Sequence, residues 1–318
     1  MLKLFATAIA LGFALSPATL MAQAKYPVST VTLATHSSPG GGSDVFLREL
    51  VKHLQPILGV NLAVSNITGG SGAKAMAEIS KAPGNGSIFY ATTPTYIQTT
   101  LLSKPEAGYD KLDPMVIVFL DPTIIYTRAE SPFKTFADVV ADAKRNVGKQ
   151  RWGAANPASL ERIAFEKLNR MIGAKAAIVS HEGGGDLMIN VLNGTLDIGI
   201  GEVQELRSQL EAKKVRLLAV LGDKRLPEVP DLPTAKEQGV DLVVSKFRGL
   251  AGPKGVPDDV AKIWEDAIKQ ALASPAYKAI YAKEALEPVA IGREEARRFT
   301  AKFADEVKAS LTDLGVIK

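Results

Sequence analysis

The sequence predicts an α/β protein whose parallel-rich sheets are flanked by helices. β-Branched segments of strand length alternate with amphipathic segments of helix length along almost the whole chain, a pattern typical of parallel βαβ units. Glycine-rich turns follow several of the predicted strands. The length of 318 residues is enough for roughly two domains of ordinary size. We therefore expect two α/β units.

The N-terminal segment has the features of an export signal. Lys3 precedes an apolar run at residues 4–15 that contains no ionisable side chain. The run is shorter than the roughly 20 residues that a membrane-spanning helix needs, but it suits a signal peptide. An A-x-A cleavage site ends at Ala24, directly before Lys25. The alternative, a buried N-terminal helix, would show a cap or a polar face. We expect residues 1–24 to be a signal peptide that is cleaved after Ala24, and the product to be soluble and periplasmic.

The predicted elements follow one another in a regular order. Val45, Leu47, Leu50 and Leu54, for example, recur on one face of the first helix. Strands are predicted at residues 29–35, 62–66, 87–92, 150–154, 177–180, 196–201, 215–222 and 242–247, and residues 115–127 hold two apolar runs, MVIVFL and TIIYT, around Asp121-Pro122. Helices are predicted at residues 44–58, 73–81, 135–146, 159–172, 186–193, 203–212, 257–273, 275–285 and 293–314.

The chain is expected to pass between the two domains twice. A proline-rich connection at residues 226–234 leads to the predicted strand 242–247, which we interpret as the return to the first domain. We place the crossings at residues 127–129 and 245–248. Domain 1 is then 25–127 plus 249–318, and domain 2 is 128–248.

Composition excludes several kinds of chemistry. There is no cysteine, so disulfides, thiolate metal sites and cysteine nucleophiles are excluded. The three histidines stand at none of the spacings of a zinc site. We expect no metal and no cofactor. The net charge of +4 comes from 38 basic and 34 acidic residues without a basic stripe, which argues against a nucleic-acid partner.

Two similar glycine loops carry the strongest functional signal. Residues 36–43 and 181–186 each follow a predicted strand, begin with a histidine, contain three consecutive glycines and open a helix. Backbone N–H groups in such a loop, together with the helix N-terminus, can hold an anion. Ser37, Ser38 and Ser43 add hydroxyl donors, whereas Asp44 is better interpreted as a first-turn acid. The alternative is that each cluster is only a tight turn.

Two further loops are expected at the same edges of the sheets. Residues 153–159 open a helix and offer Asn156 and Ser159, and Thr92 and Thr93 close another predicted strand. In open α/β sheets, ligands lie outside the carboxyl ends of the strands. His36 and His181 could act as general bases, but neither has an evident nucleophile, and a neutral hydrogen-bonding role suits both.

The sequence contains only one partial match to a motif that is typical of enzymes. Residues 70–75 match the dinucleotide pattern G-x-G-x-x-A, but the following strand ends without the acid that binds a ribose. Neither a nucleophile elbow nor a P-loop motif occurs.

These motifs resemble, in order, those of the substrate-binding proteins of tripartite tricarboxylate transporters, the Bug family. The resemblance extends from about residue 30 to the C-terminus. It is carried by PGGGSD at residues 39–44, ITGGSG at 67–72, PGNG at 83–86, GGG at 183–185, LNGTLD at 192–197, LLAV at 217–220, VPDLPT at 229–234 and GLAGP at 249–253.

The resemblance implies a type II periplasmic binding protein, a Venus-flytrap that closes on a small carboxylate and delivers it to an inner-membrane permease with a large and a small subunit. Members hold the carboxylate through amides, hydroxyls and water, typically without an arginine clamp, and no arginine occurs in these loops. Carried over by position, the ligand-binding residues are Ser38, Gly41, Gly42, Ser43, Thr92, Thr93, Ser159, Gly184, Gly185, Asp186 and Glu202, to which the loop analysis adds Ser37, Asn156 and His181.

The resemblance leaves some questions open. Glu202 either contacts a polar or amino group of the ligand or only occupies a loop. His36, Ser37 and Ser38 replace residues that are often aromatic or proline in relatives, and His181 with Glu182 replaces a Tyr-Lys-like pair, so the ligand of a relative is not transferred. We expect a monomeric, non-enzymatic transport receptor for a di- or tricarboxylate or an aromatic acid. The alternatives are a ligand-sensing partner of a sensor kinase and an enzyme on the same fold.

Overall fold

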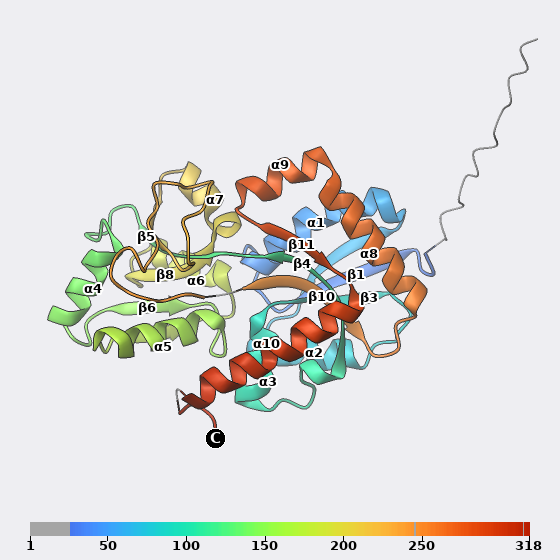
Figure 1. Ribbon diagram of the computed structural model, residues 1–318, viewed down its shortest axis with the longest axis horizontal. Coiled ribbons are helices and arrows are strands. Elements are labelled where there is room, and N and C mark those ends of the chain that lie inside the picture. The colour runs from blue at the N-terminus through green and yellow to red at the C-terminus, as the bar shows by residue number, and fades with distance from the viewer. Residues whose placement is uncertain (1–25, 245, 314) are drawn as a thin grey trace, which may run out of the picture.

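Two sheets, each flanked by helices, form two lobes that lie side by side (Figure 1). The computed structural model describes residues 26–244, 246–313 and 315–318, so the predicted signal peptide lies outside the described residues. The six-stranded sheet has the order β11-β4-β10-β3-β1-β2, and the five-stranded sheet has the order β7-β6-β8-β5-β9. The predicted fold class is confirmed. Both sheets are mixed, because the strands that enter from the other lobe pair in the antiparallel sense.

The larger lobe contains both ends of the described chain. Its strands are β1 (Thr30–Thr35), β2 (Asn61–Asn66), β3 (Ile88–Thr92), β4 (Leu112–Leu120), β10 (Phe247–Pro253) and β11 (Glu287–Ile291). Its helices are α1 (Gly42–Leu58), α2 (Ala73–Ser80), α3 (Pro94–Ser103), α8 (Asp258–Ala273), α9 (Pro275–Lys283) and α10 (Arg293–Asp313), with short 3-10 turns at η1 (Gly70–Gly72) and η2 (Tyr109–Lys111).

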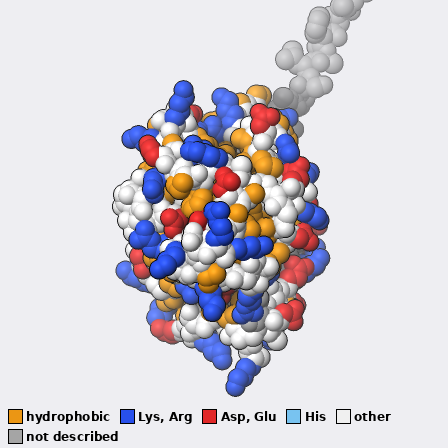
Figure 2. All heavy atoms as spheres, turned by 90° about the vertical axis from the view of Figure 1, so that its left-hand side faces the viewer, with side chains coloured by type: hydrophobic (Ala, Val, Ile, Leu, Met, Phe, Trp, Pro, Cys, Tyr) orange, Lys and Arg blue, Asp and Glu red, His pale blue; other side chains and the backbone are white. Residues whose placement is uncertain are grey.

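The smaller lobe is built from the middle of the chain. Its strands are β5 (Thr123–Arg128), β6 (Arg151–Ala154), β7 (Ala177–Ser180), β8 (Ile198–Glu202) and β9 (Val215–Val220), and its helices are α4 (Phe136–Arg145), α5 (Leu160–Ile172), α6 (Gly184–Leu192) and α7 (Val203–Glu211). Figure 2 shows this lobe from its outer end, where basic and acidic side chains are interspersed.

Alternation along the strands builds two cores in the larger lobe. Leu33 and Phe89 point to the face covered by α1 and α8, where they join the cluster around Trp264. Their neighbours Ala34 and Tyr90 point to the opposite face, covered by α2, α3 and α10. Side chains of successive strand residues lie on opposite faces, so a strand that is apolar at both positions is buried on both sides. The long apolar runs in the sequence therefore mark central strands.

The two crossings between the lobes lie next to each other. The first is at Asp121 and Pro122, because β5 already pairs with β8 and β9 of the smaller sheet. The second lies between Val244, whose N–H donates to Leu221 in the smaller lobe, and Phe247, which begins β10. The Asp121 N–H donates to the Lys246 carbonyl at 3.0 Å and joins the two crossings. The first crossing thus precedes the predicted boundary at residue 127, which is close to the far end of β5.

Three sequence predictions of secondary structure require correction. Residues 242–244 form no strand, and the strand predicted at 242–247 begins only at Phe247, once the chain has reached the larger sheet. Helix α3 was missed because its threonines favour strands, although Pro94 at the first turn and the Thr93 cap, which accepts from the Thr95 N–H, mark its start. Strand β11 was missed because it is a short edge strand with an irregular register.

Candidate functional site

The first glycine loop, residues 36–43, joins β1 to α1 and is fixed by the side chain of Asp44. One carboxylate oxygen of Asp44 accepts from the Gly40 N–H at 2.9 Å, and the other accepts from the side-chain nitrogen of Asn66 at 3.0 Å. Arg48, one turn further along α1, donates to both oxygens. Asp44 is thus a first-turn acid that holds the loop. Gly40 has a φ of 79°, which suits glycine because this left-handed conformation is unfavourable for residues with a side chain.

The second glycine loop, residues 181–186, joins β7 to α6 in the smaller lobe. The His181 N–H donates to the Ala154 carbonyl at 3.1 Å, so the loop starts beside the end of β6. Gly183 is the N-cap residue of α6, and Gly184, Gly185 and Asp186 form its first turn. The loop therefore presents a helix N-terminus, with its partial positive charge, toward the other lobe.

The two loops touch each other across the lobes through glycine backbone. A Cβ atom added at Gly183 would lie 2.5 Å from both the backbone nitrogen and Oγ of Ser38. One added at Gly185 would lie 2.3 Å from the Pro39 carbonyl oxygen, and one at Gly41 would lie 3.2 Å from the Gly184 nitrogen. Real Cβ atoms essentially never approach another heavy atom as closely as the 2.5 Å at Gly183 or the 2.3 Å at Gly185. Only glycine at these positions lets the loops meet.

Hydroxyl groups stand in the first glycine loop, at the end of β3 and at the starts of α3 and α5. The Oγ atom of Ser38 and the Oγ1 atom of Thr92 are buried and have no hydrogen-bond partner among the described residues. Thr93 caps α3, and Ser159 caps α5 by accepting from the Arg162 N–H at 3.3 Å. Buried donors without partners are uncommon in native proteins, and an unexplained one points to a ligand or ordered water. The Nε2 atom of His181, in the second glycine loop, is also buried without a hydrogen-bond partner among the described residues.

A small polar cavity of about 30 Å³ lies between the lobes at these loops. It is lined by His36, Ser37, Gly42, Ser43, Thr93, Thr95, Ala155, Asn156, Glu161, Gly183, Gly184, Ile200, Glu202, Glu205, Lys246 and Arg248. Seven residues predicted from the sequence are among them: Ser37, Gly42, Ser43, Thr93, Asn156, Gly184 and Glu202. The other seven predicted residues do not line the cavity, but they belong to the same loops or adjoin lining residues in the chain. They are Ser38, Gly41, Thr92, Ser159, His181, Gly185 and Asp186.

The sequence interpretation missed a buried ion network that forms one wall of this cavity. Arg248, which is 1% exposed, donates from Nε to Asp121 Oδ2 at 2.6 Å and from Nη1 to Ser43 Oγ at 2.9 Å. Its Nη2 donates to Glu202 Oε2 at 2.8 Å, across the lobes. The glycine loops contain no arginine in the sequence, but Arg248 lines the cavity. Arg248 had been assigned only to a crossing, because sequence alone does not place β10 beneath the first loop.

Lys246 extends the network into the smaller lobe. Its Nζ donates to Glu161 Oε1 at 2.8 Å and also to Glu202. Burial opposes the positive charge, but Glu161 and Glu202 together hold the pKa of Lys246 above its ordinary value. Glu202, for which the sequence left two roles open, is thus paired with both cations. The signal available in the sequence was a lysine and an arginine two residues apart where the chain returns to the larger lobe.

Burial shifts the pKa of four other groups at or near the cavity. It lowers the pKa of His36 to about 3, with Lys246 and Arg248 acting in the same direction, so His36 is neutral. The Nδ1 atom of His36 lies 2.5 Å from the Tyr90 hydroxyl. Burial raises the pKa of Asp121 to about 6 against the effect of Arg248, and it raises that of Glu205 to about 8 with a further contribution from Glu202. Glu205 Oε1 is buried without a hydrogen-bond partner among the described residues. Burial also lowers the pKa of His181.

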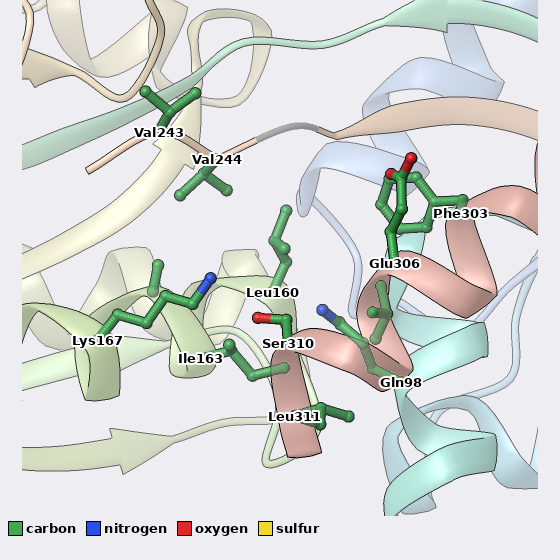
Figure 3. A pocket seen from close by; sticks show the side chains of 12 residues that line it. Gln98, Leu160, Ile163, Lys167, Val243, Val244, Phe303, Glu306, Ser310 and Leu311 are labelled. Atoms are coloured by element: carbon green, nitrogen blue, oxygen red, sulfur yellow. The ribbon is translucent and has the colours of Figure 1, made fainter. Parts of the chain in front are cut away.

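A second cavity, of about 170 Å³, lies between α5, α10 and the second crossing (Figure 3). Leu160 of α5 and Val244 of the crossing point into it, and Ile163, Val243 and Leu311 also line it. The lining is mainly apolar, and no loop of the strand ends reaches it. The polar cavity at the glycine loops is therefore the candidate site. No group of His, Asp and Glu side chains in the described part of the chain is arranged to hold a metal ion, and no helix found there is long and apolar enough to cross a membrane.

Comparison with known sequences gives one consistent result. The sequence model of the tripartite tricarboxylate transporter family receptor matches residues 46–316. A UPF0065 protein encoded in the gbd 5′ region of Cupriavidus necator is 28% identical over 317 residues, which cover 98% of this chain and 95% of the relative. The protein BugT of Bordetella pertussis is 23% identical over 288 residues, covering 89% of this chain and 87% of BugT.

Solved structures agree in fold. Rpa4515 of R. palustris, determined with adipate, has a TM-score of 0.86 at 22% identity and covers 91% of this chain and 98% of its own. MatC from Rhodopseudomonas palustris, determined with bound malate, has a TM-score of 0.79 at 22% identity and covers 92% of this chain and 100% of its own. At such identities the likeness establishes the architecture alone.

Proposed function

Because the chain belongs to the receptor family of the tripartite tricarboxylate transporters, as the order of its loop motifs predicted, we propose that it is a periplasmic solute-binding protein. It captures a small organic carboxylate between the two lobes and delivers it to the large and small membrane subunits of such a transporter. The residues predicted to form a signal peptide direct its export, and cleavage follows Ala24. The fold neighbours determined with adipate and with malate support a carboxylate as the ligand.

The meeting of the two glycine loops carries this proposal. The N-termini of α1 and α6 approach each other from different lobes, and glycine backbone forms the contact. A carboxylate placed between them would receive N–H groups and hydroxyls from both lobes at once. Such a ligand binds the closed arrangement better than an open one, so it shifts the equilibrium toward closure.

We assign ligand contacts to the residues that the sequence indicated. The larger lobe contributes Ser37, Ser38, Gly41, Gly42, Ser43, Thr92 and Thr93, and the smaller lobe contributes Asn156, Ser159, His181, Gly184, Gly185, Asp186 and Glu202. Closure turns about the adjacent crossings at residues 121–122 and 244–247, which makes the larger domain discontinuous in sequence. The cavity of about 30 Å³ has room for little more than one or two water molecules, so a carboxylate requires the loops to separate from their present contact.

We also propose that the protein is not an enzyme. The best placed base, His36, is buried, neutral and bonded to Tyr90, and it has a low pKa. A general base works best with a pKa near the working pH. His36 is better suited to positioning the loop than to moving a proton.

Thermal denaturation with a panel of carboxylates tests this function. The purified protein is freed of ligand by unfolding and refolding, and its melting temperature is measured with mono-, di- and tricarboxylates, each assayed afterwards for consumption. Stabilisation by at least one carboxylate without turnover is expected, because a ligand that binds only the folded state adds about 2.7 kcal/mol at a concentration of 100 Kd. Consumption of the ligand would establish an enzyme, and the absence of any stabilisation would contradict carboxylate binding.

A further inference from the structure

We propose that the carboxylate ligand also carries a protonated nitrogen, and that Glu205 binds this nitrogen. The inference rests on the proposed function and narrows its ligand class. It follows from the ion pairs that the charged groups around the cavity form, and from Glu205, whose carboxyl group has no cationic partner among the described residues.

Both cations at the cavity are already engaged. Lys246 contacts two carboxylates, those of Glu161 and Glu202, and Arg248 contacts those of Asp121 and Glu202. The positive charge that either cation could offer to a ligand carboxylate is thus already compensated by buried carboxylates, and displacing one of these carboxylates would leave an uncompensated charge. The ligand carboxylate is therefore left to the neutral donors of the glycine loops, where Ser38 Oγ is buried without a partner among the described residues.

Glu205 is the acid that the network leaves without a cation. Its carboxyl group makes no ion pair with any described residue, although it lines the same cavity as Gly183 and Gly184. A Cβ atom at Gly184 would lie 1.7 Å from Glu205 Oε1, and one at Gly201 would lie 2.9 Å from Oε2. Glycine at these two positions thus makes room for the carboxyl group beside the first turn of α6. An N–H donor entering between the glycine loops would find this oxygen as an acceptor.

The balance of buried charge favours a cationic group on the ligand. Asp121, Glu161 and Glu202 stand against two cations, so the network carries an excess of negative charge even when Glu205 is protonated. A dicarboxylate would add two further negative charges to a site of low dielectric constant. A ligand with one carboxylate and one ammonium group adds no net charge, and its ammonium group lies against the acidic side of the cavity.

This arrangement predicts how binding depends on pH. Burial, followed by the charge of Glu202, raises the pKa of Glu205 to about 8, so the carboxyl group is mostly protonated at pH 7. The charged and titratable groups that face it are Glu202 and Tyr126 from the neighbouring strands, Glu161 from α5, and Lys246 and Arg248 from the second crossing and β10. An ammonium group favours the ionised form, so its binding releases a proton. The affinity should then rise about tenfold per pH unit between pH 6 and 7.5.

Titration calorimetry with matched ligand pairs tests the proposal. The pairs are alanine and propionate, leucine and 4-methylpentanoate, and glutamate and glutarate, which differ only in the ammonium group. In at least one pair, the amino member should bind about tenfold or more tightly than its partner. Glu205→Gln should abolish this preference without weakening the binding of the non-amino member. Glu211→Gln, an exposed acid on the same helix, should leave the preference unchanged.

Proton counting in the unmodified protein keeps the test decisive if Glu205→Gln does not fold. Calorimetry at pH 7 in two buffers of different ionisation enthalpy should show the release of about one proton with the amino ligand. Proton uptake, or tighter binding of the non-amino member of every pair that binds, would overturn the role of Glu205 and leave carboxylate capture intact. If no member of any pair binds and the wider carboxylate panel also fails, the proposed function itself is refuted.

Discussion

Replacing Arg248 by methionine should destabilise the protein strongly, through the carboxylates that it leaves behind. Arg248 and Asp121 have side chains that are 1% and 0% exposed, and Glu202 is 2% exposed. Glu202 would keep Lys246, whereas the side chain of Asp121 would keep, among the described residues, only the amide of Gln204, at 3.1 Å. Removing one partner of a buried ion pair typically costs about 3–5 kcal/mol, since the remaining charge is uncompensated. We expect a loss in this range, from a total that for most domains is about 5–15 kcal/mol.

Equilibrium urea denaturation at pH 7.5 measures this loss, and a second substitution tests its cause. Arg248→Met combined with Asp121→Asn replaces the orphaned carboxylate by an amide, so more than half of the lost free energy of unfolding should return. Lowering the pH should also restore stability to the single variant, because protonation neutralises Asp121. The exposed Arg298, replaced by methionine, serves as control and should change stability by less than about 0.5 kcal/mol. A loss below about 1 kcal/mol for Arg248→Met, or one that Asp121→Asn does not relieve, would refute the reasoning.

Three further predictions concern closure, pH and the contact of the C-terminal helix. Gly185→Ala places a Cβ about 2.3 Å from the Pro39 carbonyl, so calorimetry should show at least about tenfold weaker carboxylate binding with an unchanged circular dichroism spectrum. Burial raises the pKa of Glu284 to about 7 against the effect of Arg207, so the folded state binds more protons than the unfolded chain. The free energy of unfolding should therefore fall as the pH rises from about 5 to 7. In urea titrations at several pH values, Glu284→Gln should flatten this dependence. Leu311→Ala enlarges the apolar cavity beside α5 and should lower the free energy of unfolding by about 2–5 kcal/mol.

Each of these has a matched control. Gly222→Ala introduces a Cβ whose nearest neighbour lies at 3.5 Å and should leave binding unchanged. Glu228→Gln replaces an exposed acid and should preserve the pH slope, and Val147→Ala removes a side chain at a position that is 47% exposed. Equal effects in a variant and its control would contradict the corresponding argument.

Local patterns predicted most of the elements and the loops of the site. The apolar spacing from Val45 to Leu54 predicted α1, and the glycine loop before it was placed correctly between a strand and a helix. Strand β11 and helix α3 were not predicted, because an edge strand and a threonine-rich helix lack a strong period. The segment 242–247 was misinterpreted because Leu242 and Val244 are buried against the smaller lobe without pairing as a strand.

The sequence by itself determined the alternation of strands and helices, the two glycine loops and the family. These depend on local spacing and on residues that are adjacent in the chain. Only the tertiary structure decided that the loops meet across the lobes and that Lys246 and Arg248 stand in the cavity with Glu161, Glu202 and Glu205. Arg248 lies 127 residues from Asp121 and 205 residues from Ser43, so no local pattern links them. The burial that shifts their pKa values exists only when the lobes have folded and closed around them.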